Sequence, residues 1–190
     1  MARLPLLDPS DADPPAAELL SRIAGERGRA FNVYRVLANS PGVLERVYGL
    51  AGYLWRESEL GPKLTELAIL RVALLTASDY EWCRHRELAR RAGVGDAQVA
   101  ALATWAEPDS PFDPIERAVL TLVDETTIEV EASEQAVAAV RGALGERATL
   151  ELIVLAGFYG MVSRLLRSLD VDPELGDGVV GTVGREANSE

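Results

Sequence analysis

The chain has a single histidine, His85, so any imidazole chemistry must use this side chain. Glu81 precedes it by four residues, a spacing that lets the carboxylate and the imidazole touch on one face of a helix. Glu66 is a second carboxylate, and it lies in an otherwise apolar segment, where a buried charge needs a partner. Arg71, His85 and Glu81 are the candidates for this partner. Two carboxylates beside one imidazole predict a general acid–base set, because each group shifts the pKa of the others.

Structural roles could explain the same residues. Ser78 and Glu81 have the spacing of a capping box, in which both side chains bond to the first turn of a helix. A buried His–Glu pair is more often structural than catalytic, and Glu66 with Arg71 could form a buried ion pair. A metal site built from Glu66, Glu81 and His85 would lack the clustered His and Cys ligands of most such sites. We therefore expect no metal and no cofactor.

Cys83 is the only cysteine, so no disulfide can form within the chain. On a helical wheel it lies about 160° from His85, which favours a packed or surface thiol over a nucleophile that works with the imidazole. The three tryptophans are most simply core or interface anchors.

The elements that must position these residues are helices. Apolar residues recur at spacings of three and four along most of the chain, which predicts an all-α fold. The segment 64–76 is apolar on every side except at Glu66 and Arg71, which indicates a central buried helix. Antiparallel packing of the next helix would bring Glu81 and His85 towards it. The one strand candidate, Thr126 to Glu131, could equally be a helix end and a loop. Helices are expected over 16–29, 33–38, 41–57, 64–76, 78–91, 96–105, 115–126, 133–144 and 148–169.

The length of 190 residues and the 48% hydrophobic content predict one globular domain, over residues 16–173. Residues 1–15 carry four prolines and three aspartates and are expected to form an extended arm, whereas the glycine-rich segment 174–190 is expected to be a disordered tail. The net charge of −11 argues against nucleic-acid binding. Glu151 and Arg164 bracket the longest apolar stretch, which falls short of the roughly 18 residues of a membrane span. With no signal-peptide core at the N-terminus, we expect a cytoplasmic protein with no membrane partner.

The stretch from Glu66 to His85, continued by LARRAGV at 88–94, resembles the carboxymuconolactone decarboxylase family, which includes the alkylhydroperoxidase-D-like proteins. A looser similarity extends over most of residues 30–170. The resemblance implies an all-α, multi-helix bundle that assembles as a homo-oligomer, usually a trimer or a hexamer.

In the peroxidase branch of that family a Glu, a Cys-x-x-Cys pair and a downstream His form a proton relay and a redox-active disulfide. The resemblance places Glu66 at the Glu position and His85 at the His position, while Ser78 and Glu81 stand where the two cysteines would be. A serine and a glutamate cannot cycle through thiolate and disulfide. The chain is therefore closer to the decarboxylase branch, which also lacks the cysteine pair.

The activity implied by the resemblance is that of a small-molecule lyase, which removes carbon dioxide from a carboxylated lactone or related carboxylic acid. His85 would protonate the resulting enolate-like carbon, Glu81 would orient the imidazole, and Glu66 would complete the relay. Arg84 is a second candidate for binding a substrate carboxylate. The alternatives are an antioxidant peroxidase that depends on Cys83 and a non-catalytic helical assembly protein. The substrate-binding residues expected are Arg71, Ser78, Tyr80 and Trp82.

Overall fold

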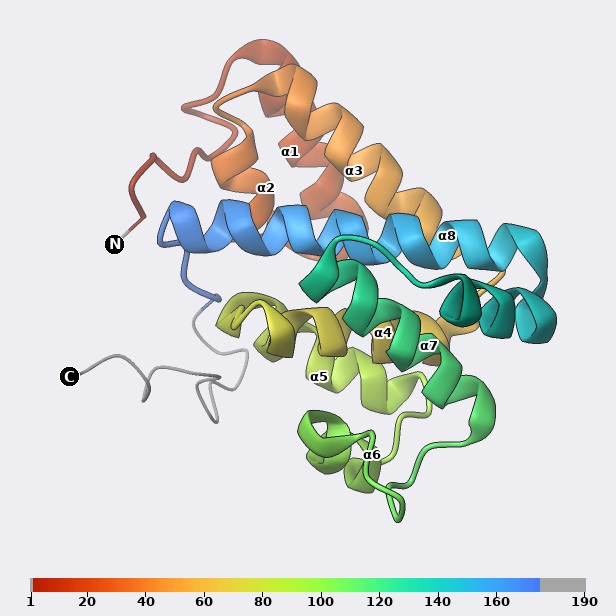
Figure 1. Ribbon diagram of the computed structural model, residues 1–190. Helices are drawn as coiled ribbons and strands as arrows, with labels where there is room; N and C mark the ends of the chain where they lie inside the picture. Colours follow the sequence, from red (N-terminus) through yellow and green to blue (C-terminus); the bar gives the residue numbers. More distant parts are fainter. Residues whose placement is uncertain (1, 175–190) are drawn as a thin grey trace.

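The computed structural model describes residues 2–174, and every regular element in this part of the chain is helical (Figure 1). The all-α prediction is therefore confirmed. Short 3₁₀ and π turns follow the sixth and seventh helices, at Leu102–Thr104 and Glu125–Glu129. The helices are α1 (Pro14–Arg27), α2 (Asn32–Leu37), α3 (Pro41–Arg56), α4 (Gly61–Leu75), α5 (Asp79–Arg91), α6 (Asp96–Ala101), α7 (Pro114–Asp124) and α8 (Glu134–Ser168).

The central helix of the fold is α4, as the apolar segment 64–76 predicts. Its residues 65–73 are all buried, and the helix packs against α5, α7 and α8. Leu67 and Leu70 join an apolar cluster with α5 and α7, while Ala68 and Ile69 join another with α8. Because α4 is surrounded on all sides, the side chain of Glu66 is held in the interior.

The last two predicted helices are both present and share the label α8. They meet at a kink at Gly145, whose φ of 86° lies in the left-handed region that favours glycine. By length and composition α8 is the one helix among residues 2–174 that could cross a membrane. However, 61% of its most apolar window is buried inside the fold, and the helix packs on α4 and α7. This is the position of a core helix.

The helices form two groups. In Figure 1, α1, α2 and α3 lie on one side of α8, and α4 to α7 lie on the other. The first group has its own apolar cluster, built around Leu20, Ile23 and Leu44. Residues from both groups and from α8 meet at the candidate site.

Both ends of the described chain contact the helical body. Residues 2–13 form no helix, and α1 begins directly at Pro14 and Pro15, because the first turn of a helix needs no backbone N–H donors. Of the predicted tail 174–190, only Glu174 lies within the described residues, and its side chain is buried with 8% exposed. Residues 175–190 lie outside the described part.

Candidate functional site

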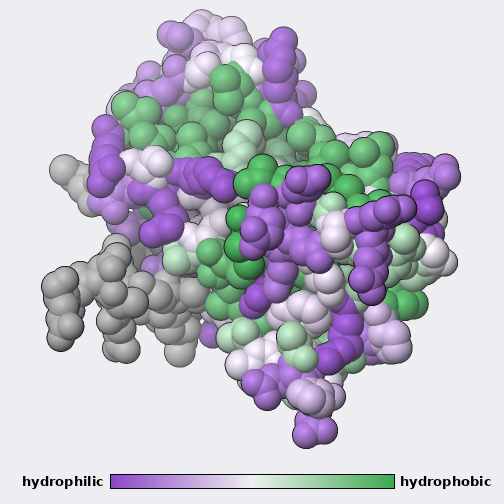
Figure 2. All heavy atoms as spheres, in the orientation of Figure 1, coloured by the Kyte–Doolittle hydropathy of each residue, from purple (hydrophilic) through white to green (hydrophobic). Residues whose placement is uncertain are grey.

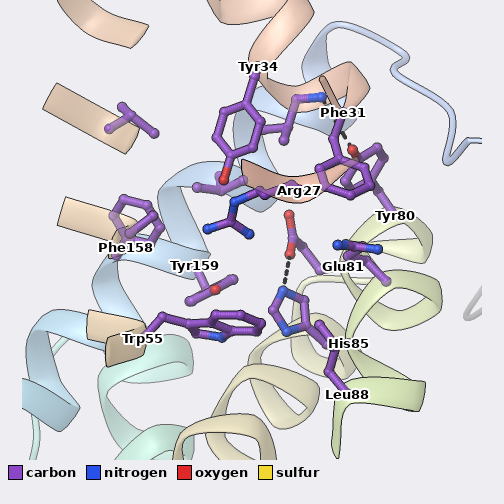
Figure 3. A pocket seen from close by; sticks show the side chains of 15 residues that line it. Arg27, Phe31, Tyr34, Trp55, Tyr80, Glu81, His85, Leu88, Phe158 and Tyr159 are labelled. Atoms are coloured by element: carbon purple, nitrogen blue, oxygen red, sulfur yellow. Dashed lines mark hydrogen bonds and ion pairs between the residues drawn. The ribbon is translucent and has the colours of Figure 1, made fainter. Parts of the chain in front are cut away.

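A pocket of about 60 Å³ lies where α1, α2, α3, α5 and α8 meet. Figure 3 shows aromatic side chains around a few central polar groups. Small-molecule sites commonly have this composition, in which apolar walls provide the contact area and a few polar groups provide the chemistry. Its lining residues are Arg27, Phe31, Val33, Tyr34, Val47, Ala51, Trp55, Tyr80, Glu81, Arg84, His85, Leu88, Phe158, Tyr159 and Val162.

His85 lies between two carboxylates. Its Nδ1 is 2.8 Å from Oε2 of Glu66, and its Nε2 is 3.3 Å from Oε2 of Glu81. Figure 3 shows the second contact at the floor of the pocket. Of the three candidate partners for Glu66, the structure therefore selects His85. The three side chains that the sequence predicted as a set are therefore in contact.

Burial disfavours a charged imidazole and on its own would lower the pKa of His85. The carboxylate of Glu66 outweighs burial through its charge and its hydrogen bond, Glu81 adds to the effect, and together they raise the pKa of His85 to about 9. At neutral pH the ring is therefore a cation that donates one N–H to each carboxylate. In this state it can give a proton but cannot take one.

The two carboxylates have different surroundings. Glu66 is only 3% exposed, and its Oε1 accepts a hydrogen bond from Nε1 of Trp55 at 3.0 Å while its Oε2 contacts His85. Glu66 does not line the pocket, whereas Glu81 does. Glu66 is thus placed to hold the imidazole, whereas Glu81 and His85 both line the pocket.

The predicted capping box at the start of α5 is wrong. Ser78 is the N-cap residue, but its side chain makes no capping hydrogen bond, and Glu81 turns to His85 instead of the first backbone amide. The Ser78 hydroxyl is buried and has no hydrogen-bond partner within the described part of the chain. The Glu81 carboxylate therefore contacts the imidazole of His85 and does not cap the start of α5.

Three buried tyrosines contribute hydroxyl groups near the pocket. Burial raises the pKa of Tyr34 and Tyr159, and for Tyr159 the carboxylates of Glu81 and Glu66 raise it further. Burial and the neighbouring Glu174 also raise the pKa of Tyr80. All three hydroxyls therefore stay neutral at physiological pH.

The structure brings only one of the four predicted substrate-binding residues to the pocket, namely Tyr80. Arg71 is turned away: its Nε and Nη2 donate to the Asp124 carboxylate at 2.6 and 2.7 Å, and its Nη1 donates to the Leu102 carbonyl. Ser78 is buried outside the lining, and Trp82 packs against a different apolar cluster, which includes Leu67 and Leu102. Arg84, the second candidate for binding a carboxylate, does line the pocket.

Several lining residues had no signal in the sequence. Arg27 belongs to α1, Trp55 to α3, and Phe158 and Tyr159 to α8, so only the packing of distant helices brings them to His85. Cys83 is next to Arg84 in α5 but does not line the pocket. Between residues 2 and 174 no three His, Cys, Asp or Glu side chains are grouped so as to hold a metal ion.

Residues 41–125 match the model of the carboxymuconolactone decarboxylase family. This segment contains Glu66, Glu81 and His85 but not Arg27 or Tyr159. No curated protein matches the sequence.

Solved structures share the fold at low sequence identity. A peroxidase-related protein from Ralstonia eutropha JMP134 with an alkylhydroperoxidase AhpD core has a TM-score of 0.79 and 14% identity, over 93% of this chain and 94% of its own. A peroxidase-related protein from Silicibacter sp. TM1040 has a TM-score of 0.76 and 19% identity, over 90% of each chain. A variant of the debrominase Bmp8, solved in complex with 2,3,4-tribromopyrrole, has a TM-score of 0.75 and 16% identity, over 93% of this chain and 96% of its own.

Proposed function

Because the chain belongs to the carboxymuconolactone decarboxylase and AhpD-like superfamily, we propose that it is a cofactor-independent lyase that removes carbon dioxide from a carboxylated lactone or a related acid. The observation that supports this proposal best is the chain of contacts from Glu66 through His85 to Glu81, which ends at an aromatic-walled pocket. It provides a proton donor without sulfur.

The reaction requires one proton. When the bond between the carboxylate and the ring carbon breaks, carbon dioxide leaves, and the electron pair stays on carbon as an enolate-like anion. The imidazolium of His85 supplies the proton, and Glu81, which accepts the hydrogen bond from Nε2, passes it into the pocket. Glu66 keeps the ring in place and stabilises its charged form, so it acts as a positioning residue.

The peroxidase alternative is less well supported by the site. The positions of the redox cysteines are occupied by Ser78 and Glu81, and none of the described lining residues contains sulfur. Cys83 forms no disulfide and lies outside this lining. The chain shares its fold with peroxidase-related proteins, but this shared fold brings no thiolate to the pocket.

The walls of the pocket suit a flat substrate. Phe158 and Tyr159 meet edge to face with ring centroids 5.4 Å apart, and Tyr159 meets His85 in the same way at 5.1 Å. The related debrominase structure contains a flat five-membered ring, 2,3,4-tribromopyrrole. We therefore place a ring-shaped acid among the substrates to test first.

The test is carbon dioxide release from a panel of carboxylated lactones and keto acids. His85→Gln and Glu81→Gln should each lower kcat by about 100-fold or more, because the first removes the proton donor and the second removes the carboxylate that passes the proton on. Cys83→Ser is the matched control on the same helix and should keep the wild-type rate. Wild-type turnover in His85→Gln would contradict the lyase, and peroxide consumption lost in Cys83→Ser would support the peroxidase. Variants at 66, 81 and 85 that change only stability would support the assembly protein.

A further inference from the structure

We propose that Arg27 and Arg84 form a carboxylate-binding subsite in this pocket, and that its ligand is a flat, ring-sized carboxylate. The inference deepens the proposed function, since the ligand would be the substrate of the same site. It concerns binding, however, and does not depend on turnover.

The first argument is that neither guanidinium has a carboxylate partner within residues 2–174, although both line the pocket. The chain has 30 acidic residues against 19 basic ones, so acidic side chains outnumber the basic ones. Arg35, Arg71 and Arg147, for example, each pair with one. Two arginines without such a partner, from different helices and facing one pocket, indicate that an external anion completes them.

The second argument is that aromatic rings hold both groups. The guanidinium carbon of Arg84 lies 3.8 Å from the centroid of the Phe31 ring, and that of Arg27 lies 5.5 Å from the centroid of Trp55. A guanidinium stacked on a ring keeps its N–H edge free to donate, which suits bidentate recognition of a carboxylate. In Figure 3, Arg27 and Glu81 point into the same space from opposite walls.

The third argument is the charge balance of the site. Glu66 and Glu81 carry two negative charges, while Arg27, Arg84 and the imidazolium of His85 carry three positive ones. The site therefore has one positive charge in excess, within a protein whose net charge is −11. One carboxylate bound by the two arginines offsets this excess, whereas the neutral tyrosine hydroxyls cannot.

The carboxylate bound by the two arginines is the one that the substrate keeps. Two guanidinium groups stabilise a carboxylate in its charged form, and this opposes the loss of uncharged carbon dioxide from that same group. The leaving carboxylate must instead lie towards the aromatic wall, near Glu81. It follows that the product still carries an anion and competes with the substrate for Arg27 and Arg84.

Benzoate tests the subsite because it is flat and anionic and cannot be turned over here. Its neutral isostere, benzamide, has the same shape without the charge. Binding to the full chain is followed through the ring-proton NMR signals of the single histidine. We expect benzoate to shift these signals to saturation, with an affinity about tenfold or more above that of benzamide.

Arg27→Gln and Arg84→Gln should each weaken benzoate binding about tenfold or more and leave benzamide binding unchanged. Arg46→Gln is the matched control, because Arg46 is exposed on the surface beside Glu45. Arg27→Lys and Arg84→Lys keep the positive charge but lose the paired N–H donors of the guanidinium, so they should bind benzoate with intermediate affinity. These lysine variants replace a glutamine variant that does not fold. Equal affinity for benzoate and benzamide, no benzoate binding by the wild type, or unchanged binding in the arginine variants would overturn the subsite.

The two proposals can fail separately. Arginine-dependent benzoate binding without carbon dioxide release from any acid would leave the subsite standing and remove the lyase. Carbon dioxide release with an unchanged KM in Arg27→Gln and Arg84→Gln would support the lyase and overturn the subsite.

Discussion

A cationic imidazole between two buried carboxylates has a measurable signature. The carboxylates of Glu66 and Glu81 outweigh burial and raise the pKa of His85 to about 9. Glu66→Gln should lower the pKa by one unit or more, because it removes the stronger of the two carboxylate effects, and an NMR titration of the single imidazole measures it directly. Glu87→Gln, at an exposed position on the same helix, is the control. A wild-type pKa near the ordinary 6.5 would contradict the arrangement.

The same pKa makes stability depend on pH in a defined direction. The folded pKa of His85 lies above the unfolded value, so its contribution is fully present below pH 6.5 and is lost as the pH rises through about 9. The size of the loss is about 3 kcal/mol in the wild type. Urea unfolding of Glu66→Gln at several pH values should show a flatter dependence across this window.

At the residue level the sequence predicted the relay but only part of the pocket. The four-residue spacing of Glu81 and His85 follows from helix geometry, and the single charge in an apolar helix identifies Glu66 as needing a partner. Arg27 could not be found in this way, because only the packing of α1 on α3 places it near His85. Arg71 was wrongly predicted to bind substrate for a related reason, since its partner Asp124 comes from α7.

Among the elements, the long helix α8 is tied to the loop after α3 by one buried carboxylate, Glu151. It accepts hydrogen bonds from the hydroxyls of Tyr53 and Ser58, from the backbone N–H of Glu59 and from Nε of Arg147. Burial alone would raise the pKa of Glu151, but these donors outweigh it and lower the pKa to about 2. The contribution of Glu151 to stability is therefore present above its ordinary pKa and is lost as the pH falls through about 2.

Glu151→Gln should destabilise the protein by about 2 kcal/mol or more, because the amide cannot satisfy all of these donors and leaves some of them buried without an acceptor. Thermal unfolding measures the loss. Glu146→Gln, one turn earlier on the exposed side of α8, should have almost no effect. Equal melting temperatures for the two variants would show that the loop is held by other contacts.

The π turn after α7 ends in a strained residue. Val130 has φ of 67° and is 83% exposed, so a β-branched side chain occupies the left-handed region with no packing in return. Val130→Gly should stabilise the protein by about 1 kcal/mol. The same change at Val43, an exposed position inside α3, should instead destabilise it by about 0.5 kcal/mol or more. Melting temperatures that move in the same direction for both variants would contradict this account.

The order of the helices was predictable from periodicity, but their ends and joins were less so. The ambiguous segment Thr126 to Glu131 contains most of the π turn and the strained residue Val130 after it. This conformation is uncommon, and the spacing of apolar residues does not predict it. Likewise, the break between the last two predicted helices shrinks to a kink at Gly145, where the backbone leaves the helical conformation.

For the whole molecule, we expect the homo-oligomer that the family resemblance implies, with α8 at the interface. Leu150, Val154 and Met161 repeat along one side of α8 and are exposed. Figure 2 shows hydrophobic surface over α3 and α8 on this face. Leu150→Glu should shift the molar mass measured by light scattering towards that of one chain, while Glu146→Gln should not. A wild-type mass of 20.5 kDa would show that the chain does not assemble.

The contacts of Glu174 connect the far end of the described chain to the pocket. Its Oε1 accepts hydrogen bonds from the hydroxyl of Tyr80 and from the backbone N–H of Asn32. An exopeptidase that shortened the protein from its C-terminal side would, on reaching Glu174, remove the acceptor that fixes a lining tyrosine. Trimming during purification or storage that extended to this residue would therefore change ligand affinity.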